Sequence, residues 1–316
     1  MTKQHKAFQF RMLPNKEQEV LLAKTFGCVR FVYNQMLAER KEMYEKFKDD
    51  KEALQEQKFP TPAKYKEEFP FLKEVDSLAL ANAQLNLQSA YKNFFEGNAA
   101  FPKFKNRKAK QSYTTNRVNG NIELQEGHIK LPKLKLVKIK QHRKIPTDYK
   151  LKSCTISKTK SGKYYISILT EYEKDIKPVS IQEVVGLDFA MDGLYVESEQ
   201  GEKANYPKFY RQSLDKVAKE QRILSRRKKG SARREKQRLK VAALQEKTAN
   251  QRKNFLHQQS KELASTYDAV VTRRLGHERN VSGPSLWEKC SQQRLGDVHA
   301  LFSVQAKRTR ETTCEN

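Results

Sequence analysis

The chain has 316 residues, with 63 Lys and Arg against 37 Asp and Glu, so its formal net charge is +26 and its isoelectric point is near 9.8. Such an excess disfavours an ordinary soluble metabolic enzyme, because like charges repel, and it favours a polyanionic partner that neutralises them and releases counterions. No apolar run approaches the roughly 18–20 residues that span a bilayer, and the N-terminus has no apolar signal core, so we expect a nucleic-acid partner and no membrane.

The first third of the chain predicts one strand followed by helices. Lys6–Leu13 alternates apolar and polar side chains, which is strand periodicity. Asn15 is a suitable N-cap for a helix whose apolar residues recur at helical spacing over Val20–Tyr44. A second amphipathic helix is expected over Leu78–Phe95, and Gly97 closes it. The pattern therefore predicts a helical bundle inserted after a single strand.

The middle of the chain predicts short strands. A turn at Lys160–Lys163 joins the last two of them as a hairpin. The strand-like runs are Ile129–Leu131, Leu136–Ile139, Cys154–Ser157 and Tyr164–Tyr172. Together with the first strand, they predict a small β-barrel that the helical insert interrupts.

A third region begins with a buried strand at Val184–Asp188, and a second strand is expected at Gly193–Val196. A long helical stretch over Ser213–Thr266, broken near Gly230, follows. Tyr267–Val271 returns to a buried-strand pattern. Helices between strands predict an α/β arrangement here.

The chain's cysteines give no metal-site spacing. Cys28, Cys154, Cys290 and Cys314 lie far apart and form no CxxC pair. This favours a reducing cytoplasm and argues against a zinc site.

Asp188 is the first candidate for chemistry, because it follows an apolar strand and precedes another strand. A carboxylate at the end of a central strand is how RNase H-like nucleases hold the first ligand of two metal ions. Two Mg²⁺ ions need several carboxylates, since each supplies only one or two oxygens. The alternative is that Asp188 is an ordinary turn or cap residue.

Positive charge is densest in the long helical stretch, and few acids accompany it between residues 226 and 234. We expect phosphate contacts along this basic arm, with a solvated basic helix as the alternative. The cations concerned are Arg226, Arg227, Lys228, Lys229, Arg233, Arg234, Arg252 and Lys253.

A second basic segment, Phe101–Lys110 with the nearby Tyr113, places aromatic residues among cations. Aromatic faces stack on unpaired bases while cations hold phosphates. Alternatively, Phe101 and Phe104 are core anchors of the barrel. The residues predicted to bind nucleic acid are Lys103, Lys105, Arg107, Lys108 and Tyr113.

Nine strings stand out by their order and spacing: Phe10–Pro14, Phe26–Asn34, Leu72–Ser77, Phe94–Gly97, Phe101–Lys105, Ser161–Tyr165, Val185–Asp188, Pro207–Tyr210 and Ala249–His257. Together they resemble the TnpB (OrfB-type) family of insertion-sequence proteins, over residues 1 to about 272. The resemblance implies an RNA-guided DNA endonuclease related to type V CRISPR nucleases, with guide RNA and DNA as partners. It leaves the oligomeric state open.

The resemblance also implies a fold, α/β by class and α+β overall. A wedge-like β-barrel with an inserted helical recognition bundle precedes an incomplete RNase H-like (RuvC) domain. The implied parts are the first barrel strand (1–14), the helical insert (15–100), the rest of the barrel (101–180), the partial RuvC-like domain with the basic arm (181–272) and a tail (273–316).

The family's RuvC-like site takes three acids: an Asp in the first strand, a Glu in a Glu-Asp-Leu string and a late Asp after a CxxC zinc ribbon. Asp188 matches the first, and Mg²⁺ is the implied cofactor. The Glu should follow Thr272, but this sequence continues as Arg273-Arg-Leu-Gly-His277. Neither a zinc ribbon nor a late Asp in the family's context follows. We therefore expect Asp188 to be a vestigial ligand that binds Mg²⁺ weakly or not at all.

Residues 273–316 differ in character from the rest: they contain no Ile and no Tyr, six Arg against two Lys, and the chain's single Trp, Trp287. Codons permitted by this tail allow a reading, one nucleotide later, that begins Glu-Asp-Leu. We interpret the tail as an out-of-frame peptide after a frameshift near Thr272, and the chain as an inactive relative of the nucleases. Two alternatives stay open. One is a nuclease-dead, RNA-guided repressor. The other is an active nuclease whose frame is restored by ribosomal frameshifting or by correcting the recorded sequence.

Overall fold

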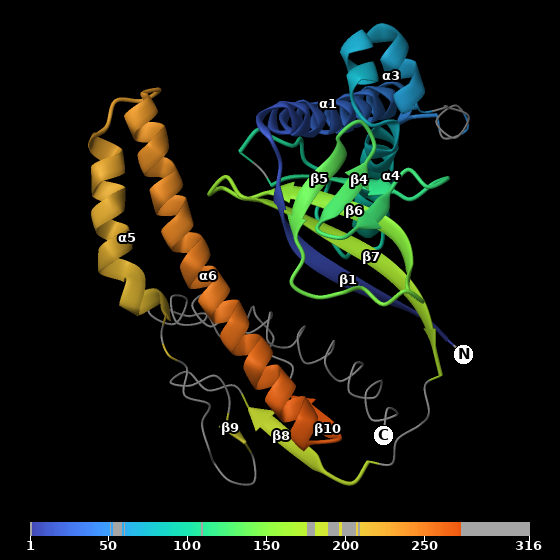
Figure 1. Cartoon of the computed structure of the whole chain (residues 1–316). Coiled ribbons are helices and arrows are strands. Elements are labelled where there is room, and N and C mark those ends of the chain that lie inside the picture. The colour runs from blue at the N-terminus through green and yellow to red at the C-terminus, as the bar shows by residue number, and fades with distance from the viewer. Residues whose placement is uncertain are drawn as a thin grey trace. The chain divides into compact units, whose positions relative to one another are not determined.

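The computed structural model describes residues 2–50, 52, 59, 61–108, 110–175, 181–188, 196–197, 207 and 209–272. The chain divides into an N-terminal unit, residues 3–173, and a C-terminal unit formed by residues 174–316 with residues 1–2 (Figure 1). The interpretation of residues 273–316 as an out-of-frame tail falls outside the described residues.

The N-terminal unit is built on a seven-stranded sheet with the order β2-β6-β7-β1-β5-β4-β3. Five of its neighbouring pairs, β1–β5, β2–β6, β3–β4, β4–β5 and β6–β7, are antiparallel. The strands are β1 (Thr2–Leu13), β2 (Gln111–Asn116), β3 (Glu123–Gln125), β4 (His128–Leu131), β5 (Lys135–Lys140), β6 (Lys150–Lys158) and β7 (Tyr164–Lys174). The hairpin predicted at Lys160–Lys163 is confirmed, because β6 and β7 pair on either side of it.

The strands predicted to form a small β-barrel pair in one sheet, but a closed barrel is not found in the described part of the chain. Strands β2 and β3 end the sheet on opposite sides, and they do not pair with each other. Helices α1 (Lys16–Phe47) and α4 (Ser77–Phe95) contact β2, and β3 has only three residues. The sheet is therefore open, with helices packed against one edge strand and a short strand at the other edge.

Local capping signals set the helix ends as predicted. The Asn15 side chain accepts a hydrogen bond from the Gln18 backbone N–H at 2.8 Å, and Gln18 Oε1 accepts from the Asn15 N–H at 3.0 Å, which forms a capping box at the start of α1. Gly97, with φ of +73°, follows the end of α4. Between α1 and α4 lie α3 (Pro62–Glu68) and the short 3₁₀ helix η1 (Pro70–Glu74).

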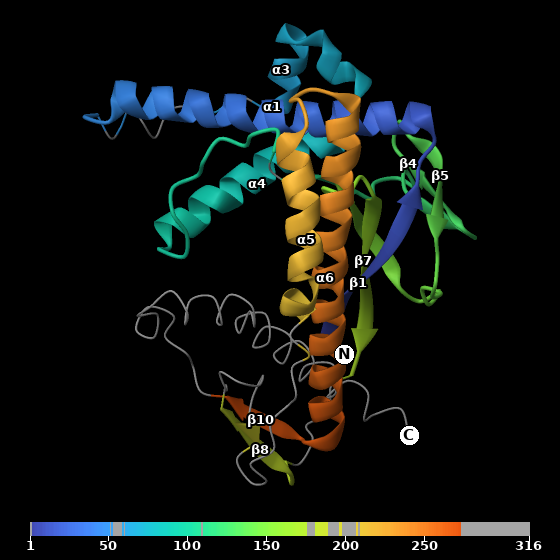
Figure 2. The same cartoon turned by 90° about the vertical axis from the view of Figure 1, so that its left-hand side faces the viewer.

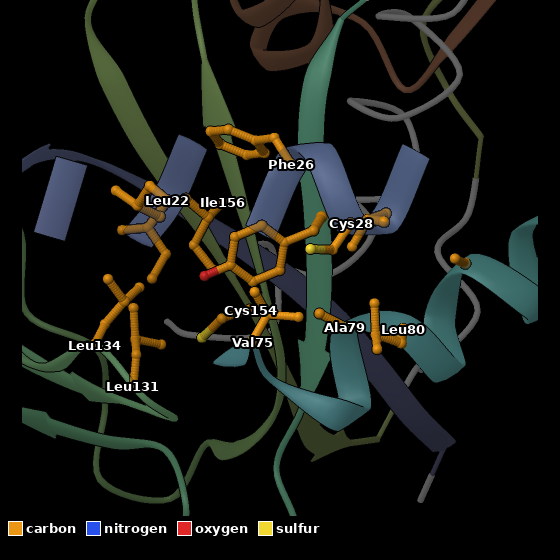
Figure 3. Close-up of a cluster of buried hydrophobic side chains, with 14 of the residues drawn as sticks. Leu22, Phe26, Cys28, Val75, Ala79, Leu80, Leu131, Leu134, Cys154 and Ile156 are labelled. Atoms are coloured by element: carbon orange, nitrogen blue, oxygen red, sulfur yellow. The ribbon is translucent and has the colours of Figure 1, made fainter. Parts of the chain in front are cut away.

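The core of the N-terminal unit lies where α1 and α4 meet the sheet, and Figure 3 shows part of it. Leu22 from α1, Leu80 from α4 and Ile156 from β6 are each fully buried. Cys28 and Cys154 are buried free thiols, and burial raises the pKa of Cys154 to about 12. A buried thiol with a raised pKa is unreactive, so these cysteines act as apolar core residues.

The C-terminal unit contains a three-stranded sheet with the order β10-β8-β9 and a long helical hairpin. Its elements are β8 (Val184–Asp188), β9 (Val196–Glu197), α5 (Phe209–Arg226), α6 (Ala232–Thr266) and β10 (Ala269–Thr272). Strand β8 is parallel to β10 and antiparallel to β9. Val185 and Leu187 of β8 pack against Leu256 and Leu263 of α6. The predicted break in the helical stretch is confirmed, because Gly230, with φ of +83°, lies between α5 and α6, which run side by side (Figure 2).

Candidate functional site

Asp188 is the last residue of the central strand in the C-terminal sheet. Its Cα lies opposite that of Val196 in the antiparallel pair β8–β9, and the preceding residue, Leu187, lies opposite Thr272 in the parallel pair β8–β10. The prediction that Asp188 ends a strand is confirmed. The second strand, expected at Gly193–Val196, is seen as β9 over Val196–Glu197, while residues 193–195 lie outside the described residues. The described part of Asp188 is its backbone.

Asp268 lies just before the start of β10, at the end of the β8–β10 pair opposite to Asp188. Its Oδ2 accepts hydrogen bonds from the backbone N–H groups of Gln182, at 3.0 Å, and Glu183, at 3.1 Å. These bonds hold the pKa of Asp268 below its usual value, because they stabilise the carboxylate form. Asp268 thereby joins the segment before β8 to the start of β10, which supports the pairing that places Asp188 beside Thr272.

No group of three or more His, Cys, Asp or Glu side chains that could hold a metal ion occurs in the described ranges. Two Mg²⁺ ions need several carboxylates. Residues 189–195 and those after Thr272 lie outside the described ranges, so the Mg²⁺ site that the sequence resemblance implies stays a prediction. The helices of the same ranges include none that is long and apolar enough to cross a membrane.

The α5–α6 hairpin is held together by a polar contact close to the basic arm. Gln237 Nε2, from α6, donates to the Glu220 backbone carbonyl at 3.0 Å and to Glu220 Oε2 at 2.6 Å. Lys240 Nζ lies 2.8 Å from Glu220 Oε1. Glu220 and Gln237 are both buried. This contact fixes the register of α5 on α6 and so positions the cations at the tip of the hairpin.

The predicted arm cations occupy the tip and the outer faces of this hairpin. Arg226, Lys228, Lys229, Arg233 and Lys253 are exposed, whereas Arg227, Arg234 and Arg252 are half-buried. Arg227 donates a hydrogen bond to the Arg233 carbonyl, which links the two sides of the tip. Arg234 Nη1 and Arg252 Nε are buried and have no hydrogen-bond partner among the described residues.

We predict that the hairpin loses stability in acid because of Glu220. Lys240 and Gln237 lower the pKa of Glu220, so the folded state favours its carboxylate. This contribution is present above the ordinary Glu pKa of about 4.3 and is lost as the pH falls through the lowered value. Glu220→Gln should lower the melting temperature at neutral pH, and the variant should converge with the wild type in acid. Thermal melts followed by helical circular dichroism test this, with Asp215→Asn, an exposed carboxylate of the same helix, as the control. An equal effect of Glu220→Gln at both pH values would contradict it.

The second basic segment, Phe101–Lys110, follows α4 and is bonded to α1. Asn34 of α1 accepts a hydrogen bond from the Lys105 backbone N–H at 2.8 Å and donates to the Lys105 carbonyl at 2.9 Å. Lys105 Nζ lies 3.8 Å from the centroid of the Tyr33 ring, and burial lowers the pKa of Lys105. Lys103, Arg107 and Lys108 are exposed. Three of the four cations predicted to bind nucleic acid in this segment are therefore exposed, while Lys105 is half-buried against the helix.

Tyr113 is a correction to the predicted nucleic-acid-binding residues. Its side chain is only 5% exposed, and its ring lies 5.7 Å from that of Phe26 in the core. Tyr113 and Thr115 alternate on the buried face of β2. A ring enclosed in this way has no free face for a base, so Tyr113 is a core residue.

Sequence reasoning pointed to Phe101 and Phe104 but missed the rings at the end of α4 that join them in one aromatic surface. Tyr91 and Phe94 from α4 lie against Phe101 of the following segment, and Phe95 lies against Tyr91 and Phe94, with ring centroids 5.2–6.3 Å apart. Lys41 of α1 places its ammonium 5.3 Å from the Phe101 centroid and 4.8 Å from that of Phe104. The available signal was the pair Phe94-Phe95 just before Gly97. We call Tyr91, Phe94, Phe95, Phe101 and Phe104 the aromatic surface.

Two family models match the chain: one described as a helix-turn-helix domain of OrfB of IS605 type over residues 1–49, and one described as "Probable transposase", also OrfB of IS605 type, over residues 167–281. The chain is 33% identical over 267 residues to a protein of Streptomyces pristinaespiralis named "Putative RNA-guided DNA endonuclease". It is 30% identical over 269 residues to InsQ of Escherichia coli K12, which bears the same description. The chain belongs to the TnpB (OrfB) family.

The matches to the two TnpB relatives cover 84% and 85% of this chain but 66% of each relative. In the part that the first family model matches, this TnpB-family chain forms the strand β1 and the single long helix α1 rather than two helices joined by a turn. A solved Cas12f1–sgRNA–target DNA complex contains a chain with the same fold, at a TM-score of 0.56 and 10% identity over 97% of this chain and 88% of that one.

Proposed function

We propose that this TnpB-family chain binds guide RNA and DNA and that, with the sequence it has, it does not cut DNA. The observation that carries the proposal is the junction at the end of β10. Strand β10 ends at Thr272 beside the end of β8, where Asp188 lies. The sequence then continues with Arg273 and Arg274, where the family resemblance expects the second catalytic acid.

The proposed binding of guide RNA and DNA is supported by the charge of the chain and by its similarity to known proteins. The chain carries a net charge of +26, and exposed cations gather at the tip of the α5–α6 hairpin and around Lys103–Lys108. The relatives are named as RNA-guided DNA endonucleases, and the chain of similar fold is part of a complex with guide RNA and target DNA. Both the positive charge and the similar proteins favour binding of a polyanion such as RNA or DNA.

The loss of cleavage follows from the ligand count. A two-metal nuclease uses paired ions to stabilise both the attacking and the leaving oxygen, and the ions need several carboxylates. Asp188 alone cannot hold them. We attribute the missing acids to a one-base frameshift after Thr272, which makes residues 273–316 an out-of-frame peptide. The nucleotide sequence tests this directly: the shifted frame must read Glu-Asp-Leu and stay open, and an early stop codon in that frame would refute it.

A nuclease-dead, RNA-guided DNA-binding repressor is the second candidate function. The well-packed N-terminal unit and the fixed register of the α5–α6 hairpin favour it, because target recognition needs ordered surfaces but no metal site. The two candidates differ in a cell-based assay. A repressor lowers expression of a reporter that carries the target site, whereas a decayed gene product does not.

We expect RNA binding to weaken steeply with salt. A plot of log affinity against log salt concentration should have a strong negative slope, and Arg233→Ala at the hairpin tip should reduce the slope by about one, because one phosphate contact is lost. Filter binding to a structured RNA measures this. Lys24→Ala is the control, since Lys24 is paired with Glu74 at 2.6 Å and should leave the slope unchanged. A flat salt response of the wild type would exclude the proposed binding.

A further inference from the structure

The aromatic surface is exposed in a way that folding alone does not explain. Phe95 is 78% exposed, Phe104 51% and Phe101 40%. Burying a large apolar side chain is favourable, so rings that stay in solvent and touch one another mark an interaction site. The turn after α4, with Gly97 at φ of +73°, returns the chain so that Phe101 contacts Phe94 edge-on, with centroids 5.2 Å apart. Two segments thus join their rings in one surface.

The rings have cations among them, which limits the kind of partner. Lys41 Nζ lies 4.8 Å from the Phe104 centroid and 5.3 Å from that of Phe101, and Lys103, between these two rings in the sequence, is exposed. The nearby acid Glu96 lies 3.7 Å from Lys92. An apolar protein surface would remove water from Lys41 and Lys103 without replacing it. A nucleotide strand offers bases to the rings and phosphates to the cations.

We propose that the aromatic surface stacks unpaired bases of the nucleic acid that this protein binds, with Phe95 and Phe101 as the stacking rings and Lys41 and Lys103 as phosphate contacts. The proposal rests on the proposed nucleic-acid binding and names the part of the ligand that this surface takes. Bases inside a duplex are already stacked on each other, so the surface takes single-stranded nucleotides. It takes over the stacking role that the buried Tyr113 cannot perform.

The test compares three substitutions on α4 in the full chain. Phe95→Ala should weaken binding of a single-stranded oligouridine about tenfold, as for the loss of one stacked base, and Phe95→Trp should restore it. Leu85→Ala is the matched control, because Leu85 is an exposed apolar residue of the same helix, 51% exposed, that lies outside the aromatic surface. Fluorescence anisotropy at several salt concentrations should show the same log–log slope for Phe95→Ala as for the wild type, since the ring carries no charge.

Further outcomes distinguish a failure of the stacking proposal from a failure of the proposed nucleic-acid binding. A blunt RNA duplex should bind the wild type and Phe95→Ala equally, and a parallel series with oligothymidine shows whether the surface distinguishes RNA from DNA. If the wild type binds the oligonucleotide and Phe95→Ala binds it equally well, the stacking proposal is overturned while nucleic-acid binding stands. If the wild type does not bind, the proposed function itself fails. Concentration-dependent dimerisation in sedimentation velocity that Phe95→Ala abolishes would instead assign the surface to a second copy of this chain.

Discussion

Deleting one nucleotide at the Thr272–Arg273 junction, so that the shifted frame is read onward, is expected to produce a magnesium-dependent nuclease from a chain that we propose to be inactive. The deletion supplies a Glu next to the end of β10, which runs parallel to β8 and brings Thr272 opposite Leu187. The new acid would then lie near Asp188, and two carboxylates begin to meet the ligand demand of paired Mg²⁺ ions. Plasmid cleavage in the presence of the guide RNA, with and without Mg²⁺, measures the gain.

In the restored chain, Asp188→Ala should reduce cleavage by about a thousandfold or more. Metal ions contribute several kcal/mol to stabilising the transition state, and each 1.4 kcal/mol is tenfold in rate. The control is Asp215→Ala, because Asp215 is an exposed carboxylate on α5 and should leave the rate unchanged. RNA affinity measured in parallel shows whether Asp188→Ala has only disrupted folding.

Two results would count against this account. Magnesium-dependent cleavage by the unrestored chain would show that the acids of residues 1–316 suffice, and the assignment of inactivity would be wrong. Cleavage by the restored chain that Asp188→Ala does not affect would remove Asp188 from the site while leaving the frameshift in place.

The elements that the sequence predicted well are those with local signals. The capping box of Asn15 and Gln18 fixes the start of α1 through two hydrogen bonds within four residues. The hairpin of β6 and β7 follows from alternating strands around Gly162, whose φ is +88°. The open sheet was not predictable in the same way, because β1 pairs with β5 across more than a hundred residues and closure depends on which edges the helices contact.

The candidate site residues likewise divide into those with a local sequence signal and those that depend on long-range packing. Asp188 was placed at the end of β8 because an apolar run before an acid is a local pattern. Tyr113 was misassigned because its neighbours Gln111, Ser112 and Thr114 are polar, and only the packing of β2 against α1 shows that its ring meets Phe26. The exposed Phe95 was missed for the converse reason. An aromatic residue at helical spacing resembles core, and its 78% exposure is set by tertiary packing that the sequence does not reveal.

Leu80→Ala is expected to destabilise the N-terminal unit by about 2–5 kcal/mol, whereas Leu85→Ala on the same helix should change its stability by less than about 0.5 kcal/mol. Leu80 is fully buried in the cluster shown in Figure 3. Its truncation therefore leaves a cavity and removes apolar contacts. Leu85 is 51% exposed, and alanine has the higher helix propensity, so the same chemical change at that position costs little.

Native-state hydrogen exchange read by mass spectrometry separates this effect from the behaviour of the C-terminal unit. Peptides from α1, α4 and the seven-stranded sheet should exchange faster in Leu80→Ala, by a factor that corresponds to the lost stability. Peptides from α5 and α6 should keep the wild-type rates, because the core of the C-terminal unit is the separate cluster of Val185, Leu187, Leu256 and Leu263. If α6 is deprotected as much as α4, the two units unfold together.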